Sequence, residues 1–156
     1  MTIRPATLAD SEGILALLVQ VNNVHEANRP DLFIKDKTKY TAAELAEILA
    51  DKTRPIFVAA GENGAVLGYA FCVFEPHKDN YNLRDFLTLY IDDICVDEAC
   101  RGQHVATGLY EHVRQYAKAI GCYHITLNVW TCNPTAMKFY EAMGMQPLKT
   151  MMEEIV

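Results

Sequence analysis

The segment "CRGQHVATGLY", residues 100–110, combines a basic side chain, a glycine and the start of a helix. Arg101 and Gly102 follow a β-branched run that ends at Val96, and an apolar stripe with helical spacing begins at Val105. N–H groups in the first turn of a helix lack partners within it, and the helix dipole is positive there. Glycine allows close backbone approach, and arginine pairs well with phosphate. The segment therefore predicts a loop that binds an anion such as a pyrophosphate.

Two adjacent carboxylates, Asp92 and Asp93, lie inside the apolar stretch "FLTLYIDDICV". Successive side chains of a strand point to opposite faces, so we expect at least one of them where ionisation is costly. Such a carboxylate is either paired with another group or used in chemistry, for example as a base. A structural role, in capping a loop or bonding to a helix, is the alternative for this pair.

The elements that position these residues follow from periodicity and turn signals. A short strand in "TIRPAT" precedes two helices, which begin at capping-box sequences starting with Thr7 and Thr41. A hairpin with its turn at Asn63-Gly64 comes next, and Phe86–Val96 is expected to be a central strand.

The second half of the chain continues this alternation. We expect a helix over Val105–Ile120 with Gly121 as its C-terminal cap, then a strand in "YHITLNVW". Asn133-Pro134 starts a further helix that Gly144 ends, and the tail "QPLKTMMEEI" is expected to form a last strand. The order β-α-α-β-β-β-α-β-α-β predicts an α/β fold: a mixed sheet of about six to seven strands with helices on both faces.

Composition narrows the class of protein. The 156 residues predict one domain over residues 1–156, and a net charge of −6 argues against nucleic-acid binding. No apolar run approaches the roughly 20 residues of a membrane span, and the N-terminus lacks the features of a signal peptide, so we expect a cytoplasmic protein. The five cysteines contain no C-x-x-C pair, so we expect free thiols and no metal site.

Two motifs resemble those of the GNAT superfamily of N-acetyltransferases. Residues 101–106, "RGQHVA", resemble the [QR]-x-x-G-x-[GA] loop that holds the pyrophosphate of acetyl-CoA. Residues 133–145, "NPTAMKFYEAMGM", resemble the second signature, N-x-x-A-x-x-[FL]-Y-x-x-x-G-[FM]. Both motifs fall on the expected elements and in the expected order. The order of elements is also similar to the family's along nearly the whole chain.

The resemblance implies an acetyl-CoA-dependent N-acetyltransferase and assigns its site residues. Backbone groups of the central strand would hold the pantetheine and the oxyanion, the loop would hold the pyrophosphate, and the second signature would complete the cofactor site. The implied cofactor-binding residues are Ile94, Cys95, Val96, Arg101, Gly102, Gln103, His104, Val105, Ala106, Thr107, Asn133 and Tyr140.

The resemblance also implies the catalytic groups. Tyr140, which without the motif would be interpreted as helix core, becomes the acid that protonates the leaving thiolate. The stretch "YIDDICV" is similar to the "Y-L-E-D" strand of polyamine acetyltransferases, which makes Asp92 the expected base, with Asp93 as the alternative. Cys95 as an acyl-carrying nucleophile is disfavoured, because cysteine in a central strand usually behaves as a small apolar residue.

His104 departs from the family pattern, which has glycine at this position. If the position requires a positive φ, the histidine is strained by about 1 kcal/mol or more. If the position needs only its N–H group, histidine serves equally well and its ring is free to contact phosphate. An exposed ring that points away from the site is the third alternative.

The expected acceptor is a primary amine of a small molecule, such as a polyamine or an amino-acid-like compound. The segment 25–40 should form one wall of its pocket, whereas core packing is the favoured role for Trp130. A protein N-terminal or lysine acetyltransferase is an alternative. It is weakened because Asn128 stands where ribosomal-protein alanine acetyltransferases have a glutamate. A non-catalytic acyl-CoA-binding regulatory domain is the alternative of another class, and assembly as a homodimer is left open.

Overall fold

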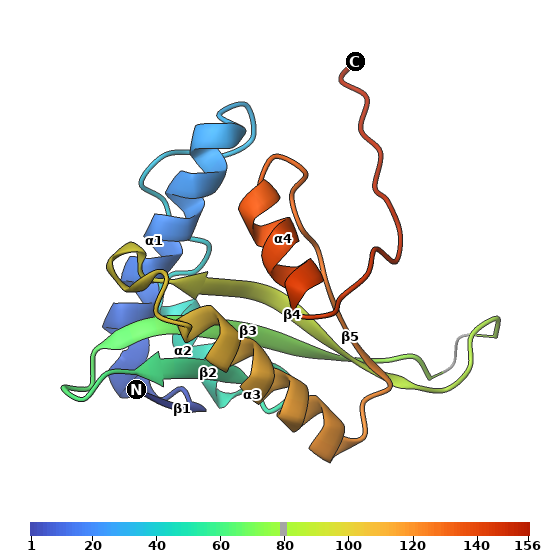
Figure 1. The fold of residues 1–156 in the computed structure, drawn as a ribbon, viewed down its shortest axis with the longest axis horizontal. Helices are drawn as coiled ribbons and strands as arrows, with labels where there is room; N and C mark the ends of the chain where they lie inside the picture. Colours follow the sequence, from blue (N-terminus) through green and yellow to red (C-terminus); the bar gives the residue numbers. More distant parts are fainter. Residues whose placement is uncertain (79–80) are drawn as a thin grey trace.

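The computed structural model describes residues 1–78 and 81–156, which form one mixed sheet with helices on both faces (Figure 1). Its strands, in both chain order and spatial order, are β1 (Thr2–Pro5), β2 (Ile56–Ala60), β3 (Val66–Pro76), β4 (Leu87–Val96) and β5 (His124–Leu127). Neighbouring strands are antiparallel except β4 and β5, which run parallel.

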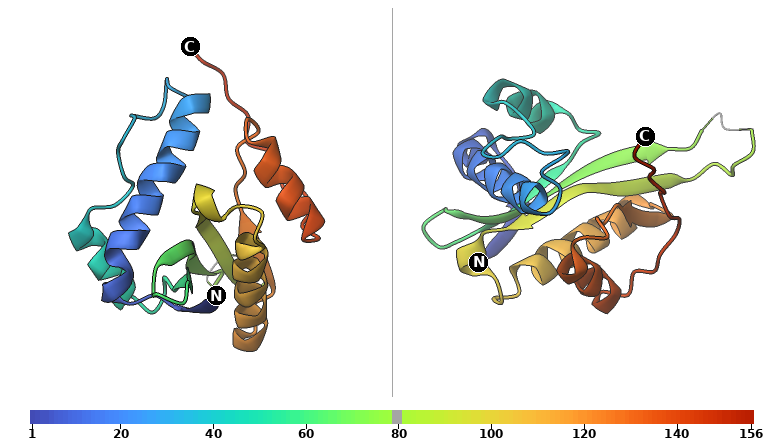
Figure 2. Two further views of the ribbon diagram at one scale, coloured as in Figure 1. Left: turned by 60° about the vertical axis from the view of Figure 1, so that its left-hand side comes forward. Right: turned by 90° about the horizontal axis from the view of Figure 1, so that it is seen from above.

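The helices form a layer on each face of this sheet. They are α1 (Ser11–Asn28), α2 (Ala42–Ala50), α3 (Val105–Ile120) and α4 (Pro134–Ala142), with 3-10 turns at Leu8–Asp10 and Glu98–Cys100. Helices α1 and α2 lie on one face, and α3 and α4 lie on the other (Figure 2). Each layer has its own buried core: Leu17 and Tyr69 belong to the first, Leu109 and Tyr140 to the second.

The short-range signals of the sequence are confirmed at several element ends. At the start of α2, Glu44 N donates to Thr41 Oγ1 (3.3 Å) and Thr41 N donates to Glu44 Oε2 (2.7 Å), which completes the capping box. Gly64 turns the β2–β3 hairpin with a φ of 81°. Gly121 ends α3 with a φ of 87°, the left-handed conformation that glycine adopts without strain.

The predicted strand count and the last predicted strand are wrong. The described residues form five strands rather than six to seven, and the chain from residue 145 to residue 156 has no helix or strand. Met151 and Ile155 are among the side chains of this tail that are almost fully exposed. An alternating pattern becomes a strand only when a neighbour accepts its hydrogen bonds, and the tail pairs with none of the described strands.

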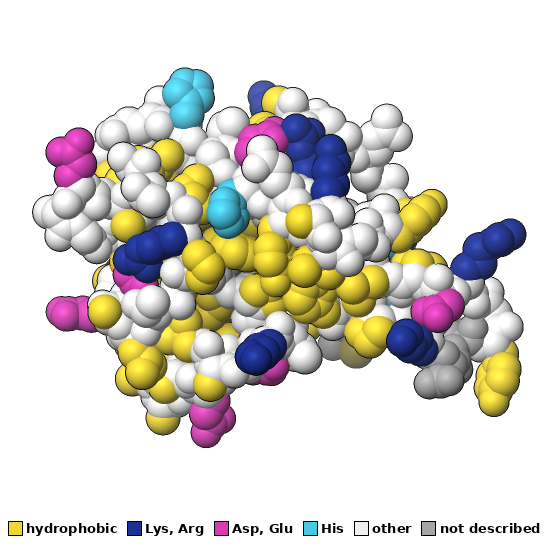
Figure 3. Space-filling view, turned by 90° about the horizontal axis from the view of Figure 1, so that it is seen from below, with side chains coloured by type: hydrophobic (Ala, Val, Ile, Leu, Met, Phe, Trp, Pro, Cys, Tyr) yellow, Lys and Arg dark blue, Asp and Glu magenta, His cyan; other side chains and the backbone are white. Residues whose placement is uncertain are grey.

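Hydrophobic side chains also reach the surface. The face seen from below carries a broad central area of them, with charged side chains around it (Figure 3). Among the described helices, none is both long and apolar enough to cross a membrane. The homodimer that was left open on sequence grounds stays a prediction.

Candidate active site

The loop between β4 and α3 has an unusual backbone. Gly102 and His104 both adopt positive φ angles, 77° and 60°. The left-handed conformation at His104, the N-cap residue of α3, corresponds to the first of the three alternatives for this position. Its ring is also exposed, and it forms no hydrogen bond with another described residue. A non-glycine residue in this conformation costs about 1 kcal/mol or more.

This backbone leaves a row of N–H groups without partners. Within the described ranges, no N–H group from Gly102 to Thr107 donates to another residue; the first to do so is that of Gly108, to His104 O at 3.0 Å. The row lies at the N-terminus of α3, where the helix dipole is positive. This arrangement fits an anionic pyrophosphate.

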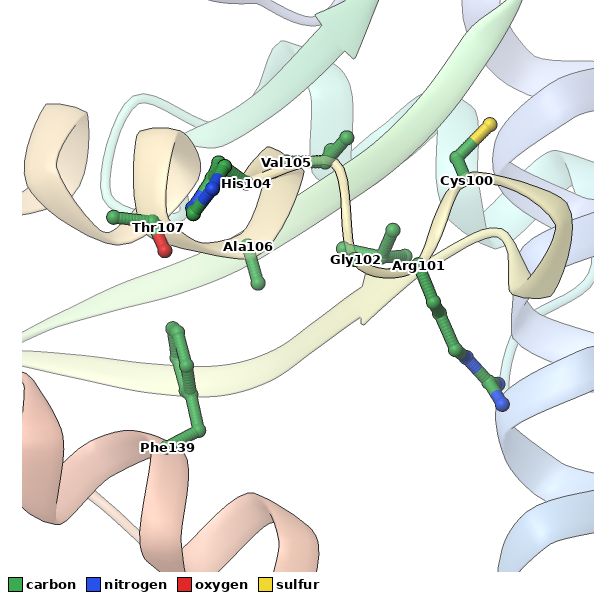
Figure 4. Close-up of a pocket in the computed structure, with 9 residues that line it drawn as sticks. Cys100, Arg101, Gly102, His104, Val105, Ala106, Thr107 and Phe139 are labelled. Carbon is green, nitrogen blue, oxygen red and sulfur yellow. The ribbon is translucent and has the colours of Figure 1, made fainter.

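A hollow of about 250 Å³ adjoins this row of N–H groups. Phe139 points into it from α4, toward the first turn of α3, whereas the Arg101 side chain extends away from that turn (Figure 4). The residues around the hollow come from the end of β4, the loop, α3 and α4: Val96, Cys100, Arg101, Gly102, His104, Val105, Ala106, Thr107 and Phe139. Seven of the predicted cofactor-binding residues therefore line one hollow.

The end of β4 next to this loop has a free edge. Strand β5 pairs with Thr88–Ile91, while Ile94 and Val96 pair only with β3. After β5 the chain runs away from β4 toward α4 (Figure 1). In the described part of the chain, no strand covers the second edge of β4 beyond Ile91. Backbone N–H and C=O groups along that edge are available to an extended ligand such as pantetheine.

The expectation that Asp92 and Asp93 point to opposite faces is wrong. The register between β3 and β4 shifts at this point: Phe71 pairs with Asp93, and Cys72 pairs with Ile91, so Asp92 has no partner on β3. This bulge interrupts the alternation of the strand. As a result, both carboxylates bond to side chains on the α1/α2 side of the sheet.

Asp92 is held by the segment that joins α1 to α2. Lys39 Nζ lies 2.7 Å from Asp92 Oδ2, and the Tyr40 hydroxyl donates to the same oxygen at 3.2 Å. Arg54 in turn donates to the Tyr40 hydroxyl at 3.3 Å. Lys39 and Tyr40 belong to the segment 25–40 that was expected to line the acceptor pocket, but their contacts with Asp92 were not predicted, because nothing in their local pattern links them to a carboxylate on β4.

Asp93 pairs with a side chain that is buried in the core. Its Oδ2 accepts a hydrogen bond from the Tyr69 hydroxyl at 2.6 Å. Burial raises the pKa of the Asp93 carboxyl and the charge of Asp92 adds to this, whereas the Tyr69 hydroxyl and the charge of Lys39 lower it. Asp93 is therefore tied to the core, and Asp92 is the more accessible candidate for a base.

Tyr140 lies on α4 in the core of the α3/α4 layer, beside Tyr110 and Phe139. Its hydroxyl forms no hydrogen bond with another described residue. Burial raises the pKa of Tyr140, and the negative charge of Asp93 raises it further. The phenol is therefore protonated at neutral pH and has a proton to donate.

Asn133 caps the N-terminus of the same helix. Its Oδ1 accepts a hydrogen bond from Ala136 N at 3.1 Å, and Pro134 occupies the first helical position. This confirms the predicted N-cap. The cap fixes the start of α4 and, through it, the place of Tyr140.

An aromatic cluster joins the α1–α2 segment to the loop after β5. Phe33 contacts both His25 and Trp130, with ring centroids 5.1 and 5.6 Å apart. Trp130 is 40% exposed, so the expectation of core packing is wrong. His25 and Phe33 belong to the segment 25–40, which was expected to form a wall of the acceptor pocket, and Trp130 contacts this segment from the loop after β5.

The surroundings of Cys95 and Asn128 do not favour a catalytic role. Cys95 is buried in the α1/α2-side core, where burial raises the pKa of its thiol to about 12, so the thiolate needed for acyl transfer is disfavoured. Asn128 donates to the Tyr90 hydroxyl at 3.0 Å. In the described ranges, no group of three or more histidine, cysteine or acidic residues could hold a metal ion.

Comparisons with known proteins agree with this geometry. A model of the acetyltransferase (GNAT) family matches residues 21–145. The chain is 30% identical over 129 residues to a thialysine N-epsilon-acetyltransferase of Bos taurus, covering 83% of this chain and 68% of that protein. It is 29% identical over 143 residues to glucosamine 6-phosphate N-acetyltransferase 1 of Oryza sativa subsp. japonica, covering 91% and 79%.

A solved structure is similar along the whole chain. The crystal structure of a tetramutant of the BH1408 protein from Bacillus halodurans superimposes with a TM-score of 0.94 at 27% sequence identity, covering 100% of both chains. The arrangement of one mixed sheet between two helical layers is thus shared with an experimentally determined structure.

Proposed function

This chain belongs to the GNAT family of acetyltransferases, which use acetyl-CoA, and is an acyltransferase; we propose that it acetylates a primary amine of a small molecule by direct transfer. The acceptor that we propose is a polyamine or an amino-acid-like compound. Direct transfer means that both substrates are bound together and that no acyl group is carried on Cys95.

The observation that carries this proposal is the continuity between the loop and the free edge of β4. In the part of the chain that the structure describes, the N–H groups of Gly102–Thr107 have no partner, and they follow within a few residues of Ile94 and Val96, whose second edge is also unpaired. An acetyl-CoA molecule with its pyrophosphate on the loop would extend its pantetheine along this edge. Its thioester would then lie close to the bulge at Asp92.

The side chains near the bulge supply the proton transfers. An amine resembling that of lysine has a pKa of about 10.4 and is protonated at neutral pH, so it must lose a proton before attack. We assign this step to Asp92, directly or through a water molecule, with Asp93 as the alternative. Backbone N–H groups of β4 would stabilise the oxyanion, and Tyr140 would protonate the thiolate that leaves.

The charged and aromatic groups near Asp92 support a small cationic amine as the acceptor. Asp92 presents a carboxylate next to the ring and the hydroxyl of Tyr40, a combination that attracts an ammonium group. The bovine relative is named for acetylation of the N-epsilon atom of thialysine, an amine of this kind. The rice relative is named for acetylation of an amino sugar phosphate. Amino sugar phosphates are therefore the first alternative class of acceptor to test.

A thiol-release assay tests the proposal. Acetyl-CoA and the protein are mixed with a panel of polyamines, lysine-like amino acids, glucosamine 6-phosphate and peptides. We expect CoA release with a small amine, and a fall in kcat of about a hundredfold for Tyr140→Phe and Asp92→Asn. Tyr110→Phe is the matched control, since it removes a neighbouring buried hydroxyl and should leave kcat nearly unchanged.

The alternatives predict different results. Unchanged kcat in Tyr140→Phe would remove the acid assignment, and a larger loss in Asp93→Asn than in Asp92→Asn would move the base to Asp93. Turnover with peptides alone would favour a protein acetyltransferase. Binding of acetyl-CoA without CoA release for any amine would favour a regulatory domain and overturn the proposed function.

A further inference from the structure

A lysine of the chain itself occupies the place where the proposed function requires the acceptor amine. Lys39 Nζ lies 2.7 Å from Asp92 Oδ2, the oxygen that we assign to proton removal. We propose that Lys39 is a self-acetylation site, modified from acetyl-CoA bound to its own chain. The inference rests on the proposed function, because it uses the same cofactor site, base and acid.

The contacts of the Lys39 ammonium group are those of a bound amine. Besides the ion pair with Asp92, it lies over the ring of Tyr40 at 5.4 Å from the centroid. The Tyr40 hydroxyl donates to the same carboxylate oxygen at 3.2 Å, which fixes the position of that oxygen. A carboxylate and an aromatic face together recognise a primary ammonium ion. The lysine is about half exposed, so acetyl-CoA does not need to enter a closed core.

The other lysines in the described ranges do not form such an ion pair. In the ranges 1–78 and 81–156, Lys39 is the lysine that forms an ion pair. Lys35 and Lys37 lie on the same segment; both are exposed, and neither forms an ion pair with a described residue. These two residues share the chain segment and the solvent access of Lys39 but not the contact with a base. They are therefore internal controls for the proposal.

The chemical step is the one that an external amine would undergo. The protonated Lys39 loses one proton to Asp92, and its nitrogen lone pair attacks the carbonyl carbon of the thioester. The new C–N bond forms, the C–S bond breaks, and the thiolate takes a proton from the Tyr140 hydroxyl. The second proton lost by nitrogen restores the Tyr140 hydroxyl through water, and the proton on Asp92 passes to solvent. The products are N-acetyl-lysine at position 39, CoA and one released proton.

The modification would change the site in a defined way. N-acetyl-Lys39 carries no charge, so its ion pair with Asp92 is lost. The carboxylate is then available to the ammonium group of an external acceptor. Self-acetylation would therefore lower the KM for the amine and leave the KM for acetyl-CoA unchanged.

Mass spectrometry of the full chain tests this directly. The purified protein is incubated with acetyl-CoA that carries a deuterated acetyl group, in the absence of added amine, and its peptides are mapped over time. We expect one labelled acetyl group at Lys39, gained about a hundredfold faster than at Lys35 or Lys37 because the reacting groups share one site. The rate should be independent of protein concentration, as an intramolecular reaction requires.

Variants separate this reaction from surface chemistry. Lys39→Arg keeps a cation beside Asp92 but should take up no label at that position, whereas Lys37→Arg should behave as the wild type. Tyr140→Phe should slow labelling of Lys39 by about a hundredfold and leave labelling of Lys35 unchanged.

The results distinguish failure of the inference from failure of the proposed function. Equal labelling of Lys35, Lys37 and Lys39 would overturn self-acetylation. An unlabelled Lys39 in a protein that acetylates an added amine would also overturn it and leave the proposed function standing. An unlabelled Lys39 together with no turnover of any amine would overturn both.

Discussion

Position 104 shows how one residue type can conflict with the backbone that its neighbours require. The chain turns from the 3-10 helix at Glu98–Cys100 into α3 through two left-handed residues, Gly102 and His104. This turn is what directs the N–H groups of the loop toward one hollow. Glycine adopts the left-handed conformation without cost, whereas in histidine the Cβ atom makes this conformation unfavourable. The strain at His104 is therefore a consequence of the loop geometry and not of a contact made by its ring.

Replacing His104 by glycine tests this strain. We expect His104→Gly to raise the free energy of unfolding by about 1 kcal/mol, because the left-handed backbone then carries no Cβ. Chemical denaturation measures the change. Gln103→Gly is the matched control: Gln103 is an exposed neighbour without a positive φ, so glycine there should lower stability slightly. A loss of stability in both variants would contradict the strain argument.

Helix α4 shows how an element places a reactive side chain. Tyr140 is seven residues beyond Asn133, whose side chain caps the helix, and it faces the α3/α4 core. The resemblance assigns Asn133 to the cofactor site, whereas its hydrogen bond to Ala136 is that of an N-cap. On this basis we expect Asn133 to act through the position of α4.

Two substitutions at Asn133 separate capping from cofactor binding. Asn133→Ala should lower the free energy of unfolding by about 1 kcal/mol and reduce kcat, since α4 begins less regularly. Asn133→Ser retains a capping oxygen and should restore most of both quantities. Thermal unfolding and steady-state kinetics measure the two effects. A rise in the KM for acetyl-CoA that serine fails to correct would instead indicate a direct contact with the cofactor.

At the scale of the whole molecule, the sheet and the α3/α4 helix layer pack closely against each other at Gly68. A Cβ built on Gly68 would lie 2.7 Å from Cys95 O and 3.2 Å from side-chain atoms of Val105 and Leu109. This glycine therefore allows β3, β4 and α3 to approach each other where the free edge of β4 meets the loop. The cofactor side of the site depends on this approach, although Gly68 itself does not line the hollow.

Gly68→Ala should consequently affect both stability and cofactor binding. We expect a loss of about 1–3 kcal/mol in the free energy of unfolding, because the added methyl group meets a backbone oxygen that cannot rotate away. The KM for acetyl-CoA should rise as β4 shifts. Gly13→Ala is the matched control, since its Cβ would crowd the Val66 side chain at 2.8 Å without meeting β4. An equal rise in KM in both variants would argue against a specific role for the β3–β4–α3 contact.

Much of the architecture could be predicted because it depends on short-range patterns. Capping at Thr41 and Asn133, the turn at Gly64 and the amphipathic stripe of α3 are determined by residues a few positions apart. The loop motif likewise lies within one short stretch, so its place at the start of α3 was predictable.

The remainder depends on which distant segments meet, and only the tertiary structure decided it. The ion pair between Lys39 and Asp92 joins residues 53 positions apart. The bulge at Asp92 arises from pairing with β3, and the tail beyond residue 144 stays outside the sheet although its sequence alternates. Alternation and charge describe what a segment could bind. Packing of the whole chain determines which partner is actually within reach, because each contact must compensate the entropy lost in forming it.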